Sequence, residues 1–433
     1  MENVCVIGLG YVGLTLAVYL ARHGKRVHGV EISENVLSAL KSGRAHFYEA
    51  DFDPELTAAI EDSSFTFSKD FPKFETPTTY IVTVGTPLTE DGTVNLASLN
   101  GVLDNILDNL KENDTVILRS TVKLGVTRNV VKRKLDTKGI QYNLGFCPER
   151  TLEGSAFEEL ASLPQVISGV DSKSLKTIKS FFKPVCSETV DLSSLEEAEM
   201  VKLLNNSERD LNFALANEVA LMSEELGLNA HTIISAANYK YPRSNIKKPG
   251  PVGGPCLEKD PYILTEGFSN KDYTPSLFLA SRKVNESIIN VGIKNLFQDL
   301  KKQDAKSPKK IAVLGFAFKG APPTGDTRGS LVKQLISQIS FYFPDAEIVG
   351  HDYLADKDDI ISAGADRHIE SLNDSLKDTD IVIIQNNHPS YAKEDWRHIS
   401  GILTPGAFIY DFWNQLESSR FQNSIIYRIF GVR

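Results

Sequence analysis

Residues 3–21 read NVCVIGLGYVGLTLAVYLA, and this stretch decides the fold of the N-terminal part of the chain. The apolar run at residues 4–7 predicts a short buried strand, which leads directly into the turn Gly8-Leu9-Gly10-Tyr11-Val12-Gly13. Residues 14–23 then predict a helix. A strand, a glycine-rich turn and a helix in this order are typical of a βαβ unit that binds a dinucleotide, with the pyrophosphate at the helix N-terminus.

The next predicted strand, residues 26–30, ends at Glu31. This acid lies about 20 residues beyond the glycine turn, where a carboxylate accepts hydrogen bonds from a ribose diol. The same carboxylate repels a 2′-phosphate, so the pattern favours NAD over NADP. The alternative is a glycine turn that binds nothing, with Glu31 as a solvated charge at the end of a strand.

The uncharged run at residues 3–21 also has to be weighed as a targeting segment. A signal peptide carries positive charge before its apolar core, but Glu2 precedes this run and three glycines interrupt it. No other segment approaches the roughly 20 apolar residues that a membrane helix needs. We therefore expect no membrane partner.

Composition narrows the function classes further. The chain has 433 residues, 41% of them hydrophobic, and a net charge of −9. An acidic chain with no long basic run is a poor candidate for binding nucleic acid, although a local anion site remains possible. The four cysteines are widely spaced and form no metal-binding pattern, so we expect no metal site and a cytoplasmic location.

Strand-like and helix-like segments alternate along much of the chain. Further strands are expected at residues 80–84, 115–118 and 165–168, and a long proline-free helix at residues 195–226. Residues 231–238 and 276–300 also look helical. Residues 301–310 resemble a linker, after which a second strand–turn–helix begins at residue 311, with strands at 347–350, 381–385 and 407–410.

We therefore expect an α/β protein with two Rossmann-like, doubly wound parallel-sheet domains joined by a central helical domain with a long helix. The expected boundaries are 1–195 for the NAD-binding domain, 196–304 for the helical domain and 305–433 for the C-terminal domain.

Residues 248–262, KPGPVGGPCLEKDPY, place Cys256 on a tight turn that is rich in glycine and proline. Lys259 and Asp260 follow within about one helical turn. A cationic neighbour and backbone N–H groups favour the nucleophilic thiolate, and Asp260 could position a water or accept a proton. The alternative is a small buried cysteine beside a surface salt bridge, and spacing alone does not decide between the two.

Seven short motifs occur in an order that resembles a known family. They are Gly8–Gly13, Val84–Pro87, Ser120–Val122, Pro148–Gly154, the helix around residues 199–206, Gly253–Asp260, and Gly315–Lys319 with Asp326–Arg328. The order is similar to that of the nucleotide-sugar 6-dehydrogenases, the UDP-glucose/GDP-mannose dehydrogenase superfamily. The segment PGPVGG favours the UDP-N-acetylhexosamine branch, of which UDP-N-acetylmannosamine dehydrogenase is the example.

The resemblance implies a four-electron oxidation of the C6 alcohol of a UDP-hexose to the uronic acid. Two NAD⁺ are used, and Cys256 carries a thiohemiacetal and then a thioester. The catalytic residues that the resemblance assigns are Cys256, Lys202, Asn206, Asp260, Thr121, Glu149 and Glu153. Lys202 and Asn206, four residues apart on a predicted helix, share one face and can serve the same oxyanion. Which of the two glutamates acts as base stays open.

The resemblance also assigns the binding residues and the partners. The NAD contacts are Gly8, Gly10, Tyr11, Val12, Gly13, Glu31, Thr86, Thr121 and Arg328. The substrate contacts are Glu149, Glu153, Lys202, Arg243, Gly253 and Lys319, with Arg243 resembling an arginine donated by a neighbouring subunit. A homodimer or a multiple of it is expected, in the setting of polysaccharide biosynthesis.

Two features leave alternatives open. Pro255 replaces the serine or histidine that the two branches carry, and the Lys259-Asp260 pair is more typical of the UDP-glucose branch. UDP-glucose and GDP-mannose therefore remain alternative substrates. A two-electron dehydrogenase of the hydroxyacid type and a dinucleotide-binding sensor without catalysis are the more remote interpretations.

Overall fold

The computed structural model describes residues 3–89, 92–269, 272–303, 306–422 and 425–433. The chain forms two compact units. Unit 1 comprises residues 1–206 and 259–274, and unit 2 comprises residues 207–258 and 275–433. The expected domain boundary between residues 304 and 305 lies outside the described residues. Within the described ranges, no helix combines the length and the apolar character that crossing a membrane requires.

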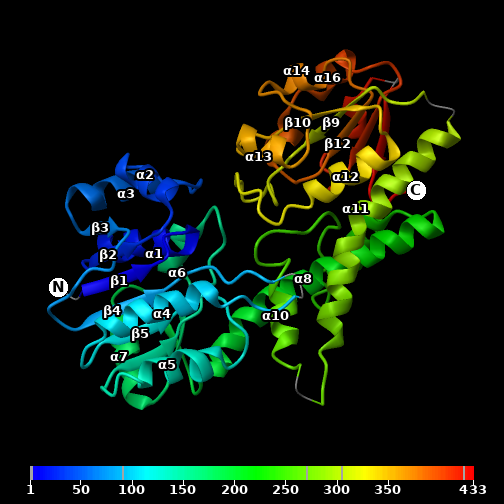
Figure 1. Cartoon of the computed structure of the whole chain (residues 1–433). Coiled ribbons are helices and arrows are strands. Elements are labelled where there is room, and N and C mark those ends of the chain that lie inside the picture. Colours follow the sequence, from blue (N-terminus) through cyan, green and yellow to red (C-terminus); the bar gives the residue numbers. More distant parts are fainter. Residues whose placement is uncertain (1–2, 90–91, 270–271, 304–305, 423–424) are drawn as a thin grey trace. The chain divides into compact units, whose positions relative to one another are not determined.

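Unit 1 is built on an eight-stranded sheet in the order β3-β2-β1-β4-β5-β6-β7-β8. The strands β3, β2, β1, β4 and β5 of this sheet are labelled in Figure 1. Its strands are β1 (Asn3–Ile7), β2 (Arg26–Val30), β3 (Phe65–Ser68), β4 (Thr78–Val82), β5 (Thr115–Leu118), β6 (Asn143–Phe146), β7 (Gln165–Gly169) and β8 (Thr189–Leu192). The strands pair in parallel except at β6 and β7, which are antiparallel. The first six follow the Rossmann order 3-2-1-4-5-6.

Helices cover both faces of this sheet because strands buried on both sides leave two apolar surfaces. The helices of unit 1 are α1 (Tyr11–Arg22), α2 (Glu34–Lys41), α3 (Phe52–Glu61), α4 (Ala97–Asn109), α5 (Arg133–Asp136), α6 (Ala156–Ser162), α7 (Ser172–Phe182) and α10 (Asp260–Glu266), with a π-helical turn η1 (Thr127–Lys132). One core joins α1, α3, α6 and α7 to the sheet, and a second joins α4, α5 and the start of α8 (Leu195–Leu226).

Unit 2 contains a six-stranded, all-parallel sheet in the order β11-β10-β9-β12-β13-β14. Its strands are β9 (Lys310–Leu314), β10 (Glu347–His351), β11 (Arg367–His368), β12 (Ile381–Ile384), β13 (Phe408–Asp411) and β14 (Ile426–Ile429). Counted from β9, this is again the order 3-2-1-4-5-6. The predicted second Rossmann-like sheet is therefore confirmed.

The helices of unit 2 are most of α8, then α9 (Ala230–Asn238), α11 (Ser276–Lys302), α12 (Val332–Tyr342), α13 (Lys357–Ser362), α14 (Leu372–Leu376), α15 (Pro389–Lys393) and α16 (Trp396–Ile402), with a 3-10 turn η2 (Ser418–Arg420). The long α11 packs its isoleucine stripe on one face of the sheet, beside α12. Helices α14 to α16 cover the other face around the buried Trp396. The predicted helix 195–226 matches α8 at both ends.

Parallel α/β sheets bind their ligands beside the carboxyl ends of the strands around the order reversal. In unit 1 these are the ends of β1, β4 and β5. In unit 2 they are the ends of β9, β12 and β13. Residues that follow these strands are therefore candidate binding residues within each unit.

Candidate active site

The turn after β1 has the geometry that a pyrophosphate requires. Gly8 has φ of +90°, which favours glycine, and its N–H donates to the Val30 carbonyl at 2.9 Å. A Cβ on Gly13 would lie 1.8 Å from the Gly8 carbonyl oxygen, so only glycine lets the helix approach the turn this closely. A Cβ on Gly10 would meet no described atom within 4 Å, which leaves the N-terminus of α1 accessible to a ligand.

Glu31 lies beside this turn at the end of β2. Its carboxylate accepts the Leu9 N–H at 2.7 Å and the Ser33 N–H at 2.9 Å. Each oxygen keeps a second lone pair that ribose hydroxyls can use. The residues of this region therefore fit the adenosine half of NAD, with the phosphates on the helix N-terminus.

Tyr11, in the first turn of α1 before Val12, connects the cofactor turn to a distant loop. Its hydroxyl donates to the buried Glu49 carboxylate and accepts the Gly154 N–H at 2.9 Å. Glu49 also accepts the N–H groups of Gly154 and Phe157, at 2.9 and 3.1 Å. Burial and the Glu49 carboxylate raise the pKa of Tyr11 well above its ordinary value, so the hydroxyl stays protonated and can donate.

Thr86 and Thr121 follow neighbouring strands, β4 and β5, and the structure brings them together. The buried Thr86 hydroxyl donates to the Thr121 carbonyl, and the Ser120 hydroxyl donates to the Val84 carbonyl at 2.7 Å. These bonds fix the two strand ends to each other. Thr121 itself is half-buried.

Glu149 and Glu153 lie in the loop after β6, in different environments. Glu149 is buried, and one of its oxygens accepts two bonds from Arg119, at 3.0 and 2.5 Å. The other oxygen accepts the N–H groups of Arg150 and Thr151 at 2.7 and 2.8 Å. Glu153 is half-buried and lies near enough to Tyr11 to raise the pKa of its hydroxyl.

These contacts decide the charge of Glu149. Burial alone would raise the pKa of its carboxyl, but the Arg119 guanidinium, the backbone N–H groups and the nearby Lys202 charge together lower the pKa below its ordinary value. Glu149 is therefore a fixed anion whose lone pairs are already engaged, which makes it a weak proton acceptor.

Helix α8 presents Lys202 and Asn206 one turn apart. Lys202 is buried, and the Asn206 amide donates to the Asp260 carboxylate at 2.5 Å. Asp260 is also fully buried, and its other oxygen forms an ion pair with Lys259 at 2.8 Å. Within unit 1, Asn206 and Asp260 are therefore in direct contact. Lys202 lies close enough to Glu149 for its charge to lower the pKa of that carboxyl.

Cys256 belongs to unit 2, in a segment that we call the cysteine strap, residues 249–258. The thiol is exposed and outside any disulfide, in contrast to the buried Cys5 and Cys147. Asp260 lies only four residues further along the chain, so covalent geometry keeps the two Cα atoms within roughly 14 Å of each other. The alternative interpretation of Cys256 as a small buried cysteine is therefore wrong.

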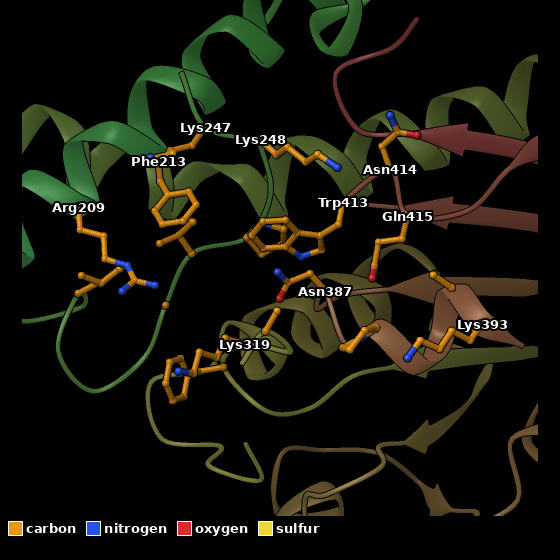
Figure 2. Close-up of a pocket in the computed structure, with 18 residues that line it drawn as sticks. Arg209, Phe213, Lys247, Lys248, Lys319, Asn387, Lys393, Trp413, Asn414 and Gln415 are labelled. Carbon is orange, nitrogen blue, oxygen red and sulfur yellow. The ribbon is translucent and has the colours of Figure 1, made fainter. Parts of the chain in front are cut away.

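A pocket of about 610 Å³ lies within unit 2 beside the cysteine strap (Figure 2). Figure 2 shows Arg209 and Phe213 projecting from α8, and Asn387, Lys393 and Trp413 from the C-terminal sheet region. The full lining is Arg209, Phe213, Lys247, Lys248, Pro251, Val252, Gly253, Leu257, Phe318, Lys319, Ala321, Asn387, Pro389, Ala392, Lys393, Trp413, Asn414 and Gln415. Five of these side chains are cationic, and the described lining contains no carboxylate.

Gly253 and Lys319, two predicted substrate contacts, thus line this pocket. A Cβ on Gly253 would lie 2.3 Å from the Gly329 carbonyl oxygen. The strap backbone therefore lies too close to Gly329 for any side chain at position 253. Lys319 lies over the Phe318 ring, 5.4 Å from its centroid. Gly253 and Leu257 reach the pocket from either side of Cys256.

Arg243 and Arg328 are placed differently, since neither lines the pocket. Arg243 is exposed and stacks on the Tyr241 ring, 4.6 Å from its centroid, with a 3.0 Å bond from its Nε to the Tyr241 hydroxyl. Arg328 is largely exposed and forms an ion pair with Asp326 at 2.6 Å.

Most of the residues that line this pocket were not predicted from the sequence. Asn387 follows β12, and Trp413, Asn414 and Gln415 follow β13, which is where ligand contacts are expected on a parallel sheet. That signal was available from the predicted strands. Arg209 and Lys247 carried no comparable signal. Among the described residues, no group of three or more His, Cys, Asp or Glu side chains could hold a metal ion.

Comparison with known proteins agrees with this geometry. Residues 2–186 match the NAD binding domain of the UDP-glucose/GDP-mannose dehydrogenase family, residues 196–287 its central domain and residues 312–418 its UDP binding domain. The chain is 33% identical over 407 residues to the UDP-N-acetyl-D-mannosamine dehydrogenase of Methanocaldococcus jannaschii, covering 93% of this chain and 90% of that protein.

Solved structures give the same result. The structure of the UDP-N-acetyl-mannosamine dehydrogenase from Pyrococcus horikoshii matches with a TM-score of 0.87 at 29% identity, covering 99% of each chain. That of the Staphylococcus aureus UDP-N-acetyl-mannosamine dehydrogenase Cap5O matches with a TM-score of 0.85 at 27% identity, covering 99% of this chain and 98% of that one. The predicted resemblance is confirmed. The chain belongs to the UDP-glucose/GDP-mannose dehydrogenase family of NAD-dependent UDP-sugar dehydrogenases.

Proposed function

We propose that the protein oxidises the C6 alcohol of UDP-N-acetylmannosamine to the carboxylate in two steps, through a thioester on Cys256. The observation that carries this proposal is the pocket of unit 2. In a chain of net charge −9, a pocket with five cations and no described carboxylate favours a strongly anionic ligand. Its aromatic side chains Phe213, Phe318 and Trp413 suit a base, and its edge is the strap that carries the thiol.

NAD⁺, when bound, supplies the hydride acceptor for both oxidations. In the first, the alcohol loses a hydride and a proton and becomes an aldehyde. The Cys256 thiolate adds to the aldehyde carbon and gives the anion of a thiohemiacetal, which loses a second hydride to become a thioester. Water hydrolyses the thioester and releases the carboxylate and the thiol. The reaction therefore consumes two NAD⁺ for each sugar.

The residues of unit 1 take distinct roles in this scheme. Lys202 and Asn206 stabilise the oxyanion of the tetrahedral adducts, since a cation and an amide donor suit developing negative charge. Asp260, oriented by its bonds to Asn206 and Lys259, positions the hydrolytic water with Thr121. Glu149 is too fully engaged to accept a proton, so we assign it to orientation and Glu153 to general base catalysis.

The choice of sugar rests on similarity. The relatives named above act, by their names, on UDP-N-acetyl-D-mannosamine, and the segment PGPVGG favours the same branch. UDP-glucose and GDP-mannose are the alternatives.

We also propose a homodimer in the cytoplasm, where NAD and nucleotide sugars are made. Helix α8 exposes Leu204, Leu215, Met222 and Leu226, each with between 42% and 70% of the residue's surface accessible. Their spacings of 11, 7 and 4 residues place them on one helix face, which is the pattern of a helix that packs against a partner. The three domains with boundaries near residues 195 and 304 remain our proposed division.

The test counts NADH formed per sugar consumed, with UDP-N-acetylmannosamine, UDP-N-acetylglucosamine, UDP-N-acetylgalactosamine, UDP-glucose and GDP-mannose offered in turn. We expect two NADH per UDP-N-acetylmannosamine. A single NADH would contradict the thioester route, and two NADH with another sugar would correct the substrate alone. Cys256→Ser should bind NAD as the wild type does and form no sugar acid. Sedimentation velocity tests the dimer.

A further inference from the structure

Asn217, on the α8 turn that faces α11, is a fully buried amide whose bonding capacity is nearly all used. Its side-chain oxygen accepts the Gly250 N–H at 2.8 Å, and its side-chain nitrogen donates to the Gly250 carbonyl at 3.1 Å. The same nitrogen donates to the Asn285 side-chain oxygen at 2.9 Å. One side chain therefore pairs with both polar groups of Gly250, in the way that a neighbouring β-strand would.

Gly250, the second residue of the cysteine strap, also packs against Trp413. A Cβ at this position would lie 2.7 Å from the Trp413 ring, so the indole packs directly on the backbone. The Trp413 indole N–H in turn donates to the Gln385 carbonyl at 2.8 Å. Gly250 is thus fixed between an amide of α8 and an aromatic ring that lines the pocket.

The Asn217 side chain is held in place in turn by Asn285, which is bonded to a buried ion pair. The Asn285 nitrogen donates to the Asp210 carboxylate at 2.8 Å and to the Asp210 carbonyl at 3.0 Å. Asp210 forms a 2.6 Å ion pair with Arg282, and all of these side chains are fully buried. The orientation of Asn217 is therefore set by a chain of contacts between α8 and α11.

The C-terminal part of the strap, residues 254–258, is held by backbone hydrogen bonds of its own. The Gly254 N–H donates to the Gly329 carbonyl at 2.7 Å, and the Glu258 N–H donates to the Gly254 carbonyl at 3.2 Å. Cys256 lies between these points. With Gly254 held on one side, the Asn217–Gly250 pairing fixes how the strap approaches it.

We infer that Asn217 is a positioning residue for Cys256: its amide holds the strap so that the thiol meets the aldehyde before that aldehyde leaves. This inference rests on the proposed function, because it concerns the covalent step. Nothing in the pairing involves the cofactor turn of unit 1, so NAD binding should be independent of it.

The experiment compares Asn217→Ala and Gly250→Ala with Asn295→Ala. Asn295 is the matched control, because its amide joins α11 to Glu224 of α8 without contacting the strap. In Asn217→Ala we expect kcat for acid formation to fall by about 100-fold, as small misplacements of a reacting group do. We also expect fewer than two NADH per sugar, with an aldehyde trapped by hydrazine, and unchanged NAD affinity. Asn295→Ala should keep two NADH per sugar.

Gly250→Ala covers the case in which Asn217→Ala fails to fold, since its Cβ displaces the strap from the Trp413 side while the Asn217–Asn285 and Asn285–Asp210 hydrogen bonds are kept. If both folded variants keep two NADH per sugar and lose no more activity than Asn295→Ala, the positioning role is wrong and Asn217 is structural only.

A second readout needs no substrate and separates this inference from the proposed function. In a Cys186→Ser background, iodoacetamide alkylation of Cys256 is followed by mass spectrometry. We expect the rate in Asn217→Ala to differ from the parent by threefold or more, and Asn295→Ala to match it. Equal rates in all three would overturn the inference. A wild-type enzyme that yields one NADH per sugar would instead overturn the thioester route.

Discussion

At the scale of single residues, Glu31 combines two tasks in one carboxylate. It accepts the Leu9 and Ser33 N–H groups at the glycine turn, and each of its oxygens keeps a lone pair that a ribose hydroxyl can use. The charge that suits a 2′-hydroxyl opposes a 2′-phosphate. The cofactor preference is therefore concentrated at this position.

We expect Glu31→Ala to raise the Kd for NAD⁺ by about tenfold, because hydrogen bonds to a charged group contribute about 1.5–3 kcal/mol and water replaces part of them. The Kd for NADP⁺ should rise less or fall, since the repulsion is removed. Calorimetric titration of both cofactors measures the ratio. Glu34→Ala, on the exposed start of α2, is the control. If the ratio of the Kd values for NAD⁺ and NADP⁺ is the same as in the wild type, Glu31 does not contact the ribose.

Single residues also show how much of the candidate site could be predicted from the sequence. The turn Gly8–Gly13, Glu31 and Cys256 were predicted because each has a local signature. Arg119 was not, although it holds Glu149, because its partner lies 30 positions away and only the sheet brings β5 and β6 side by side. Asp260 was predicted, but its bond to Asn206 spans 54 positions and no local pattern encodes it.

At the scale of elements, α8 carries a polar stripe, buried except at the half-buried Asn206, where a core helix usually carries apolar residues. Glu199, Asn206, Asp210, Asn217 and Glu224 recur at intervals of four or seven residues, with Lys202 between the first two. Each of the five holds a different segment: Glu199 the turn before η1, Asn206 the start of α10, Asp210 helix α11, Asn217 the cysteine strap, and Glu224 the C-terminal Gly431.

The helix itself was predictable, since its apolar periodicity and Gly227 marked both ends. Its polar stripe was visible in the sequence as a spacing, but the partners were not. A buried charge is tolerated only where a specific partner compensates it, and those partners come from α11 and from loops far along the chain.

We expect Arg282→Met to destabilise unit 2 by about 3–5 kcal/mol, because it leaves the Asp210 carboxylate buried without its cation. Urea unfolding followed by tryptophan fluorescence measures this, since both tryptophans, Trp396 and Trp413, lie in unit 2. Arg367→Met is the control. It removes an exposed pair with Glu347, for which about 0–1 kcal/mol is expected. Equal losses of unfolding free energy in the two variants would show that the buried ion pair stabilises unit 2 no more than the exposed one.

At the scale of the whole molecule, the charge is distributed unevenly. The chain is acidic overall, yet the pocket of unit 2 gathers Arg209, Lys247, Lys248, Lys319 and Lys393. These residues come from α8, the segment before the strap, the turn after β9 and α15. Because no short motif contains them, the sequence predicted Lys319 alone.

We expect Lys319→Ala to raise KM for the UDP-sugar by about tenfold, the loss of one charge-assisted hydrogen bond to a phosphate. The KM for NAD⁺ should not change. Raising NaCl from 50 to 500 mM should also raise KM for the sugar, and less so in the variant, because salt screens the charges that attract the diphosphate. Lys306→Ala, an exposed lysine outside the pocket, is the control. If neither Lys319→Ala nor added NaCl raises KM for the sugar, the diphosphate binds outside this pocket.

The division of the chain at residues 206–207 and 258–259 separates residues that are close in sequence. Asn206 is the last residue of unit 1 before the first crossing, and the second crossing falls between Cys256 and Asp260. The proposed nucleophile and the proposed water-positioning acid therefore belong to different units, although only residues 257–259 lie between them in the chain. This short covalent connection limits how far the two residues can separate.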